Sequence, residues 1–449
     1  MEERYIKKIL VANRGEIAIR IIRACKELDI KTVAIYSEED RGCIHTKLAD
    51  ESICIGKASA RESYLNIPNI ISACQVLNVD AVHPGFGFLS ENYKFARICE
   101  DLNIKYIGPR SNTIYEMGNK ANAKIIMEEN GINTIPGYHQ NVSDVNEAIN
   151  IAKQIGYPVL IKATYGGGGK GIRLAKNNED LKKQFNIAKL EAKNCFDKDE
   201  LYIEKFIESP KHIEFQILAD EYGNVVHLGE RDCSMQRNKQ KVLEECPSVC
   251  LSKKLRYKIG QEAVKVAKAV GYENAGTIEF LIDKDNNYYF LEMNTRIQVE
   301  HAITEEVTGI DIVKEQIKIA SRERLSFLQE DIVIKGHAIE CRINVENPRE
   351  NFKPCSGKIE KFIMPGGNGI RIDTSVYGEC IISPYYDSMI TKLIAYGKNR
   401  SEAVSRMKRA LDEMIIEGVE TNIHFQKWLI NQKSFLDGNY STEFLSKRW

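Results

Sequence analysis

Two carboxylates beside one turn are the first side chains whose spacing could do chemistry. The strand-like segments GTIEFLID and NYYFLEMN flank the sequence DKDNN, and a two-residue turn at Asp285-Asn286 would place Glu279 opposite Glu292. Directly opposed like charges destabilise a sheet unless a cation lies between them. Asn294 follows on the same face as Glu292. The three oxygen donors therefore predict a site for Mg²⁺ (or Mn²⁺) beside nucleotide phosphates, and the alternative is a solvent-facing charged hairpin.

A glycine run, GGGGKG at 166–171, lies between two strand-like segments. It lacks the Ser/Thr and the following helix of a phosphate-binding P-loop. Its backbone N–H groups could still approach phosphates closely, with Lys170 adding positive charge. A surface hairpin without a ligand is an equally good interpretation of the run alone.

Charged residues follow the carboxylate hairpin in RIQVEH (296–301). Arg296 could hold a small carboxylate-like anion through two parallel hydrogen bonds, and Glu300 could act as a general base. Isolated basic residues stand elsewhere, at Lys120, Lys162 and Arg342. Taken singly, each of these residues would more often form a structural salt bridge.

The elements that must position these residues begin with an alternating pattern. Strand-like segments at 7–12, 31–36, 79–85 and 104–109 are separated by helical ones, of which 15–28 has apolar residues at helical spacing. Strands that alternate with helices predict a parallel sheet covered on both faces.

The pattern changes further along the chain. A helix is expected from about 115 to 130, and closely spaced strands from 157 to 294 predict an antiparallel α+β region. A third section begins after Ile334 and contains a helix expected at 401–417.

Composition excludes several classes of function. The 449 residues carry 63 basic and 63 acidic side chains, without the basic surplus of a general nucleic-acid or membrane-surface binder. No apolar run reaches the length of a membrane span or of a signal-peptide core. The twelve cysteines are scattered, so buried free thiols in a reducing cytoplasm are expected rather than zinc ligands or disulfides.

The order of these segments resembles the biotin carboxylase family from the N-terminus to about Asn431. The resemblance rests on long motifs that are rarely shared outside this family: ANRGEIA (12–18), HPGFGFLSEN (83–92), YPVLIKA (157–163), GERDCSMQR (229–237), EMNTRIQVEH (292–301) and ECRIN (340–344).

The family implies an ATP-grasp fold of mixed α/β and α+β class. Its parts would be an N-terminal Rossmann-like parallel-sheet domain (1–118), an ATP-grasp domain (119–333) with a small lid (about 134–206), and a C-terminal biotin carboxylase domain (334–449).

The resemblance also implies roles for individual residues. For ATP they are Lys120, Lys162, Gly168, Gly169, Glu204, Lys205, Ile207, His212, Gln236, Lys239, Glu279, Leu281 and Glu292. For the metal they are Glu279, Glu292 and Asn294, and for bicarbonate Lys241, Arg296 and Val299. For biotin they are Arg342 and Phe86, and the catalytic set is Arg296, Glu300, Arg342 and Lys241.

The implied reaction is ATP-dependent carboxylation of biotin by bicarbonate through carboxyphosphate. The chain has no Met-Lys-Met biotinylation sequence, because Met407-Lys408-Arg409 falls in a helical pattern. Biotin is therefore expected on a separate carrier protein, with carboxyltransferase subunits as further partners and acetyl-CoA as the expected acceptor, as in fatty acid synthesis. Another acyl-CoA or pyruvate carboxylase is the alternative assignment.

Some positions depart from the family pattern. Lys239 replaces a histidine, Phe86 a tyrosine, and Tyr165 a small residue before the glycine run. The family implies a homodimer, with Arg23 and Glu27 matching interface positions, but Asn368 replaces an interface phenylalanine.

Three other functions fit the sequence less well. Another bicarbonate-activating ATP-grasp ligase would not need biotin or Arg342. A non-catalytic nucleotide-binding subunit would be expected to have lost residues such as Arg296 and Glu300. A dinucleotide-dependent oxidoreductase is excluded because NRGEIA lacks the Gly-x-Gly-x-x-Gly pattern.

Overall fold

A parallel sheet forms from the first hundred residues, as the alternating pattern predicts. The computed structural model describes residues 6–164, 171–196 and 198–448. Within the first of these ranges, parallel strands run in the order β3-β2-β1-β4-β5. The strands are β1 (Lys8–Val11), β2 (Lys31–Tyr36), β3 (Glu51–Cys54), β4 (Ala81–His83) and β5 (Lys105–Tyr106). The accompanying helices are α1 (Gly15–Glu27), α2 (Ile44–Leu48), α3 (Ile67–Val76) and α4 (Tyr93–Asp101).

The helical stretch expected from about 115 to 130 is present as two helices, and Lys120 starts the second of them, as expected from the sequence. The structure has α5 (Ser111–Gly118) and α6 (Lys120–Glu129), separated at Asn119. Asn119 has extended backbone angles, and its side chain accepts a hydrogen bond from the Asn122 N–H, which caps α6. The break places Lys120 at the first residue of a helix.

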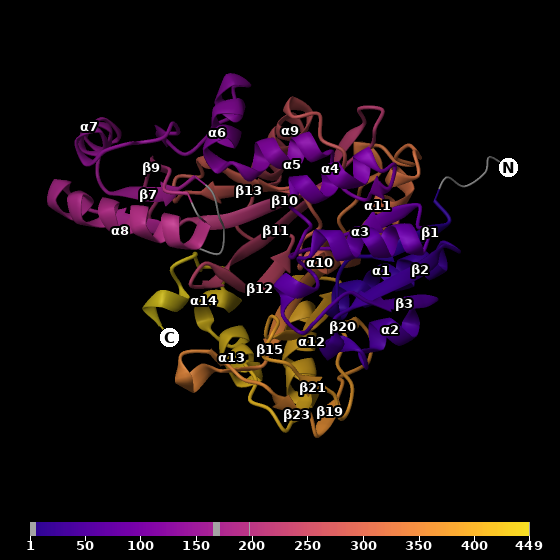
Figure 1. Cartoon of the computed structure of the whole chain (residues 1–449). Helices are drawn as coiled ribbons and strands as arrows, with labels where there is room; N and C mark the ends of the chain where they lie inside the picture. The colour runs from indigo at the N-terminus through magenta and orange to yellow at the C-terminus, as the bar shows by residue number, and fades with distance from the viewer. Residues whose placement is uncertain (1–5, 165–170, 197, 449) are drawn as a thin grey trace.

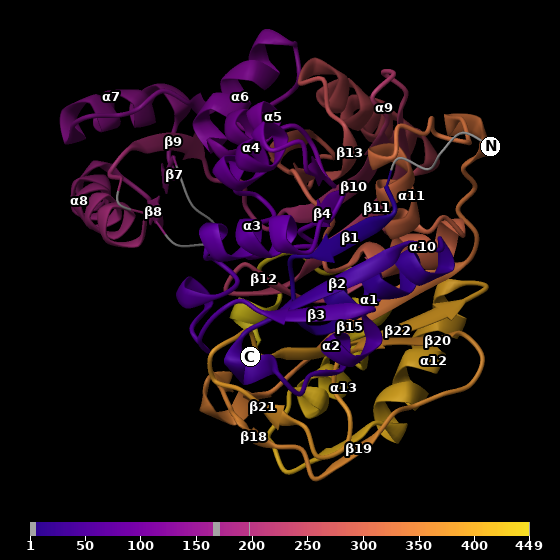
Figure 2. The same cartoon turned by 45° about the vertical axis from the view of Figure 1, so that its right-hand side comes forward.

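A small antiparallel sheet projects to one side of the molecule, at the left of Figures 1 and 2. Its strands are β6 (Gly137–Tyr138), β9 (Leu201–Lys205), β7 (Val159–Ala163) and β8 (Ile172–Ala175), in that spatial order. Helices α7 (Val145–Ile155) and α8 (Asn178–Phe196) contact this sheet and bury its apolar face. The antiparallel region predicted for the middle of the chain is confirmed.

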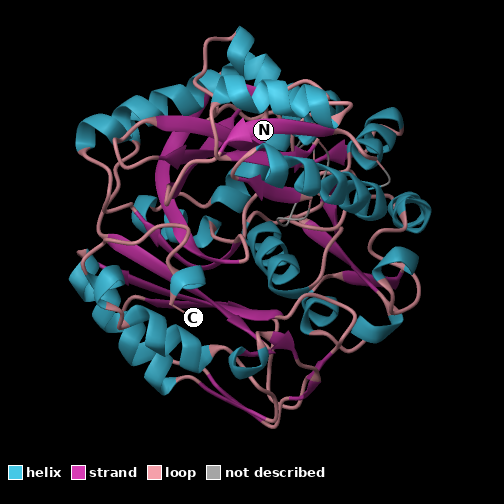
Figure 3. Ribbon diagram, turned by 90° about the vertical axis from the view of Figure 1, so that its left-hand side faces the viewer, coloured by secondary structure: helices cyan, strands magenta, loops and turns pink. Residues whose placement is uncertain are grey.

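A second, larger sheet runs through the middle and C-terminal parts of the described chain. Its eight strands follow the order β14-β13-β10-β11-β12-β15-β22-β20. They are β10 (Lys211–Ala219), β11 (Val225–Arg237), β12 (Gln240–Cys246), β13 (Asn274–Ile282), β14 (Tyr288–Asn294), β15 (His337–Asn344), β20 (Ile370–Thr374) and β22 (Met389–Gly397). Helices α9 (Lys253–Ala269), α10 (His301–Thr308) and α11 (Ile312–Ala320) contact its strands. Figure 3 shows helices, in cyan, around the magenta strands.

The C-terminal part completes the structure with short strands and helices. The helix expected at 401–417 is too long, because α12 (Arg400–Glu413) ends before β23 (Ile415–Glu417), which pairs with β19 (Lys361–Ile363). The remaining elements are β16 (Glu346–Asn347), β17 (Lys353–Pro354), β18 (Gly357–Lys358), β21 (Ile381–Ile382), α13 (Ile423–Ile430) and α14 (Lys433–Leu436). Among the residues described, no helix combines the length and apolarity that crossing a bilayer requires.

Candidate active site

A cavity of about 700 Å³ lies where the N-terminal region, the large sheet and the C-terminal part meet. Its wall includes Asn13 and Phe86 from the first part, Glu279 from the second, and Tyr386 from the third. Many of the residues selected from the sequence also line it: Phe86, His212, Lys239, Lys241, Glu279, Glu292, Asn294, Arg296, Val299 and Arg342. Segments far apart in the sequence thus converge on one space.

The predicted pairing of Glu279 with Glu292 is present, but the predicted turn is wrong. Asp283 and Asn287 pair instead, around a three-residue turn whose last residue, Asn286, has a φ of 62°. A bulge between Glu279 and Phe280 then restores the register, so that Glu279 faces Glu292. The extra turn residue and the extra strand residue compensate for each other.

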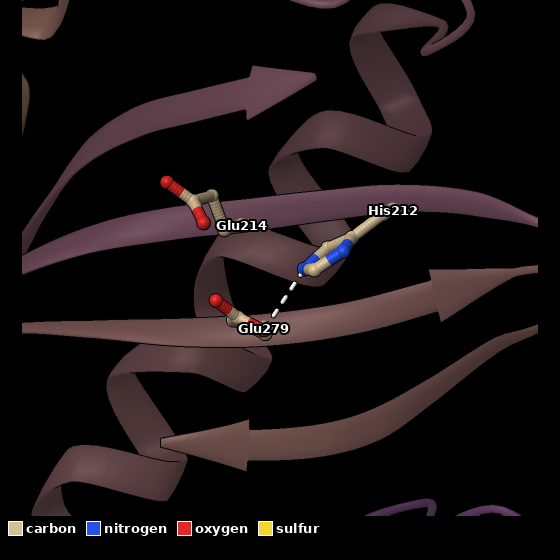
Figure 4. A group of neighbouring side chains, drawn as sticks. All are labelled: His212, Glu214 and Glu279. Carbon is tan, nitrogen blue, oxygen red and sulfur yellow. Dashed lines mark ion pairs between the residues drawn. The ribbon is translucent and has the colours of Figure 1, made fainter. Parts of the chain in front are cut away.

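Glu214 was missed in the sequence and lies directly beside Glu279. Strand β10 pairs with β13 so that Glu214 faces Glu279 in register. His212, two residues earlier on the same face, places its Nε2 2.9 Å from Glu279 Oε2 (Figure 4). The signal was present as the alternation His212, Glu214, Gln216 in HIEFQ, a two-residue period of polar side chains.

Glu300 is fully buried and receives a cation on each oxygen. Lys241 Nζ lies 2.6 Å from Oε1, and an Arg342 terminal nitrogen lies 2.8 Å from Oε2. Lys241 also contacts Glu214 and, at 3.0 Å, Glu279. One lysine therefore links three buried carboxylates.

These contacts determine the charge of Glu300. Burial alone raises the pKa of the Glu300 carboxyl, but Lys241 and Arg342 outweigh burial and hold that pKa well below its ordinary value. Glu300 is therefore a carboxylate at neutral pH. Arg342 also pairs with Glu244, whose pKa is raised to about 7 by burial, although Arg342 acts to lower it.

Arg296 projects from the loop after β14. Its Nε donates to Glu91 at 2.8 Å, and its terminal nitrogens donate to Gln298 Oε1 at 2.8 Å and Asn294 Oδ1 at 3.1 Å. Gln298, which the sequence analysis did not select, also donates to Glu279 at 3.2 Å. These contacts orient the guanidinium along the wall of the cavity.

A second basic group extends the site toward the small sheet. Lys120 contacts Glu292, and Lys162 lies 2.6 Å from the buried carboxylate of Glu204. Lys124, also buried and not selected from the sequence, contacts Glu204 too. Despite burial, Glu292 helps to raise the pKa of Lys120, whereas burial lowers the pKa of Lys162 to about 7 and that of Lys124 well below its ordinary value. Lys120 is therefore the fully charged member of this group at neutral pH, on the side of the carboxylate hairpin that faces β7 and β9.

The remaining candidates are placed as follows. Gln236 Nε2 lies 2.6 Å from His212 Nδ1, and Leu281 faces His212 in register on β13. Lys205 Nζ donates to the carbonyls of Gly156 and Tyr157 at 2.9 Å, and Ile207 is half-buried just after β9. Gly168 and Gly169, with Tyr165, lie outside the described residues.

The departures at Lys239 and Phe86 both border the cavity. Lys239 follows Asn238 in the turn between β11 and β12, and both have positive φ, 65° and 50°. The Asn13 side chain donates to the Phe86 carbonyl at 2.8 Å, which ties the HPGFGF segment to the ANRGEIA segment. Asn368, the departure at the expected dimer interface, is exposed.

Glu279, Glu292 and Asn294 have the chemistry of a hard divalent cation site. The two carboxylates oppose each other, and Asn294 Nδ2 lies 3.0 Å from Glu279 Oε1. Their negative charge is balanced here by His212, Lys241 and Lys120. Carboxylate and amide oxygens facing one cavity fit Mg²⁺ or Mn²⁺.

Comparisons with known proteins match the chain along its length. Three family models match: "Biotin carboxylase, N-terminal domain" at 5–114, "Carbamoyl-phosphate synthase L chain, ATP binding domain" at 119–328, and "Biotin carboxylase C-terminal domain" at 340–447. Biotin carboxylase 1 of Bacillus subtilis is 53% identical, and the alignment covers 98% of each chain. One pyruvate carboxylase subunit, from Methanothermobacter thermautotrophicus, is 52% identical over 98% of this chain and 89% of that protein.

A solved structure gives the same result for the fold. The biotin carboxylase domain dimer of Hydrogenobacter thermophilus 2-oxoglutarate carboxylase, in complex with MgADP, ADP and bicarbonate, superposes with a TM-score of 0.95. It is 50% identical, and the match covers 98% of this chain and 97% of that one. The expected ATP-grasp fold is confirmed.

Proposed function

Because this chain belongs to the biotin carboxylase family of ATP-dependent ligases, we propose that it carboxylates biotin on a separate carrier protein, using ATP and bicarbonate. One observation carries the proposal. Glu300 is buried between Lys241 and Arg342, behind a cavity that Arg296 also lines. This arrangement offers a base, cations for a small anion, and a guanidinium for a second substrate.

The first step is the activation of bicarbonate. Arg296 and Lys241 hold the anion beside Val299, and Glu300, ionised at neutral pH, accepts its proton. The resulting dianion attacks the γ-phosphorus of ATP, and the bond to the β-phosphate oxygen breaks to give carboxyphosphate and ADP. Lys120 and Lys162 neutralise charge on the phosphates.

The second step transfers CO₂ to biotin. Carboxyphosphate divides into CO₂ and phosphate, the phosphate takes the proton from the ureido nitrogen, and that nitrogen attacks CO₂. Negative charge develops on the ureido oxygen, and Arg342 supplies a guanidinium at the cavity wall to stabilise it. Phe86 lines the same cavity and offers an apolar contact for the biotin rings.

Glu279, Glu292 and Asn294 would hold Mg²⁺ or Mn²⁺. The cation neutralises negative charge on the nucleotide phosphates when it is bound. His212, with Gln236 behind it, fixes the orientation of Glu279 from the neighbouring strand.

We further propose acetyl-CoA as the final acceptor, in fatty acid synthesis in the cytoplasm. The Bacillus subtilis relative covers almost the same length and is named as a biotin carboxylase, without a final acceptor. The relatives named for pyruvate and 2-oxoglutarate carboxylases support the alternative. The test incubates carrier protein carboxylated by this enzyme with the carboxyltransferase subunits and one acceptor at a time: acetyl-CoA, pyruvate or 2-oxoglutarate. Malonyl-CoA, formed from acetyl-CoA, is the expected product.

A homodimer is also part of the proposal, because the Hydrogenobacter relative is described as a dimer. Arg23 and Glu27 are exposed on α1, beside a pocket that also contains Arg371. Sedimentation velocity of the chain is expected to show a dimer, and Arg23→Glu is expected to shift it toward the monomer. Three regions, 1–118, 119–333 and 334–449, would form the domains of each protomer.

The proposed activity is tested by ADP release from purified protein with Mg-ATP. Release is expected to require bicarbonate and to rise when free biotin is added, with labelled bicarbonate appearing in carboxybiotin. Release that needs bicarbonate but ignores biotin would instead identify another bicarbonate-activating ligase. No bicarbonate dependence would reject both assignments.

A further inference from the structure

Lys392 is a fully buried lysine that the reaction scheme above does not use. It lies on β22, directly opposite Arg342 of β15 on one side and Asp373 of β20 on the other. Lysine is almost never fully buried unless its charge is paired. A buried ammonium beside the arginine proposed for biotin therefore calls for a specific partner.

The ammonium reaches the loop that carries the proposed base. Lys392 Nζ donates to the backbone carbonyl of Val299 at 2.9 Å. Because the peptide unit is planar, fixing this carbonyl also fixes the nitrogen of Glu300 and the point from which its side chain begins. Val299 lines the cavity, and Lys392 holds its carbonyl without being part of the cavity wall.

Two carboxylates hold the ammonium at this position. Glu16 Oε1 lies 3.2 Å from Lys392 Nζ, and Asp373 Oδ2 lies 3.5 Å away. Burial lowers the pKa of Lys392, but these carboxylates outweigh burial and raise it, so the side chain stays charged. Glu16 comes from the ANRGEIA segment at the start of α1, and no role was assigned to it from the sequence.

We propose that Lys392 is a positioning residue for the bicarbonate-binding loop, acting through the Val299 carbonyl with Glu16 as its anchor. The inference rests on the proposed function. Glu300 and Val299 must be placed accurately against bicarbonate, because a displacement of about 1 Å can reduce a rate by roughly a hundredfold. A purely structural ion pair would stabilise the fold without affecting one substrate more than another.

The test compares Lys392→Met with the wild type at varied bicarbonate and varied Mg-ATP. Methionine keeps the apolar stem but donates nothing to Val299. The KM for bicarbonate is expected to rise about tenfold or more, as for loss of one charge-assisted hydrogen bond. The KM for Mg-ATP, and the Kd for MgADP measured by calorimetry, are each expected to stay within about twofold of the wild-type value. An unchanged KM for bicarbonate in the folded variant would overturn the inference.

Glu16→Gln is the second variant, because Lys392→Met could fail to fold. It is assayed at pH 8, above the pKa of about 7 to which burial raises the Glu16 carboxyl against the effect of Lys392. Replacing the charged anchor by a neutral one is expected to raise the KM for bicarbonate about threefold. If neither variant changes this KM, Lys392 has no positioning role.

Arg400→Met is the matched control. Arg400 is a part-buried cation that, like Lys392, donates to the backbone, here to the carbonyls of Phe435 and Leu436. It pairs with Glu245 on the opposite face of the large sheet. It is expected to lower the Tm and leave the KM for bicarbonate unchanged. An equal rise in both variants would reveal general loosening and overturn the inference. A wild-type protein without bicarbonate- and biotin-dependent ADP release would instead reject the proposed function itself.

Discussion

Arg342 donates to Glu300 at 2.8 Å, so the residue proposed to stabilise biotin and the proposed base share one ion pair. Arg342 also contacts Glu244 through the same guanidinium. Because Arg342 lowers the pKa of Glu300, loss of its positive charge would raise that pKa and make the carboxylate a stronger base. The roles proposed for Arg342 and Glu300 can therefore be tested together.

Removing Arg342 should separate the two steps. In Arg342→Met, ADP release with bicarbonate alone is expected to stay within about threefold of the wild type, whereas stimulation by biotin is lost. The pKa of Glu300 rises without Arg342, so the acid limb of the pH–rate profile moves to higher pH. Steady-state ADP release across pH checks both effects. Retained biotin stimulation would contradict the role given to Arg342.

Glu300→Gln tests the base directly. The amide keeps the volume of the side chain but cannot accept a proton from bicarbonate, so bicarbonate-dependent ADP release is expected to fall at least about a hundredfold. Binding of MgADP should be unaffected, because Glu300 contacts Lys241 and Arg342, neither of which is proposed to hold the nucleotide. Calorimetric titration with MgADP serves as the control. If the variant keeps its turnover, a residue other than Glu300 must act as the base.

The carboxylate hairpin shows what the sequence could and could not predict. The composition of β13 and β14 and their alternation were sufficient to bring Glu279 opposite Glu292. The turn length was not predictable, because Asn286 adopts a left-handed conformation and a bulge compensates for it. The error in turn length and the unpredicted bulge cancel each other. Burial of one face fixes the register of a strand pair more strongly than its turn does.

Other parts of the site could not be found from local patterns. Lys392, Val299 and Glu16 meet across three distant segments, and nothing near Lys392 in the sequence indicates that it is buried. Glu214 was within reach, because the alternation in HIEFQ already placed it beside His212. Motif resemblance located ten residues of the cavity wall to which roles are assigned, whereas the groups that hold those residues required the fold.

The metal site predicts a dependence on divalent cations. Turnover is expected to stop with a chelator and to return with Mg²⁺ or Mn²⁺. In Glu292→Gln, half-saturation with Mg²⁺ should need about tenfold more cation, because one charged oxygen ligand is lost and Lys120 loses its partner. Titration of ADP release with Mg²⁺ at fixed ATP measures this. Asp285→Asn, in the exposed turn of the same hairpin, is the control and should behave as the wild type.

Glu245 predicts how stability depends on pH. It is fully buried, and His337 and Arg400, each 2.7 Å away, outweigh the effect of burial and lower its pKa to about 2. A carboxyl whose pKa is depressed on folding stabilises the protein above its unfolded value, here by about 3 kcal/mol. That contribution is lost as pH falls from about 4.5 toward 2. Glu245→Gln should therefore lower the urea midpoint strongly at pH 7 and by roughly half as much at pH 3. An equal difference at both pH values would show that packing, not charge, is responsible.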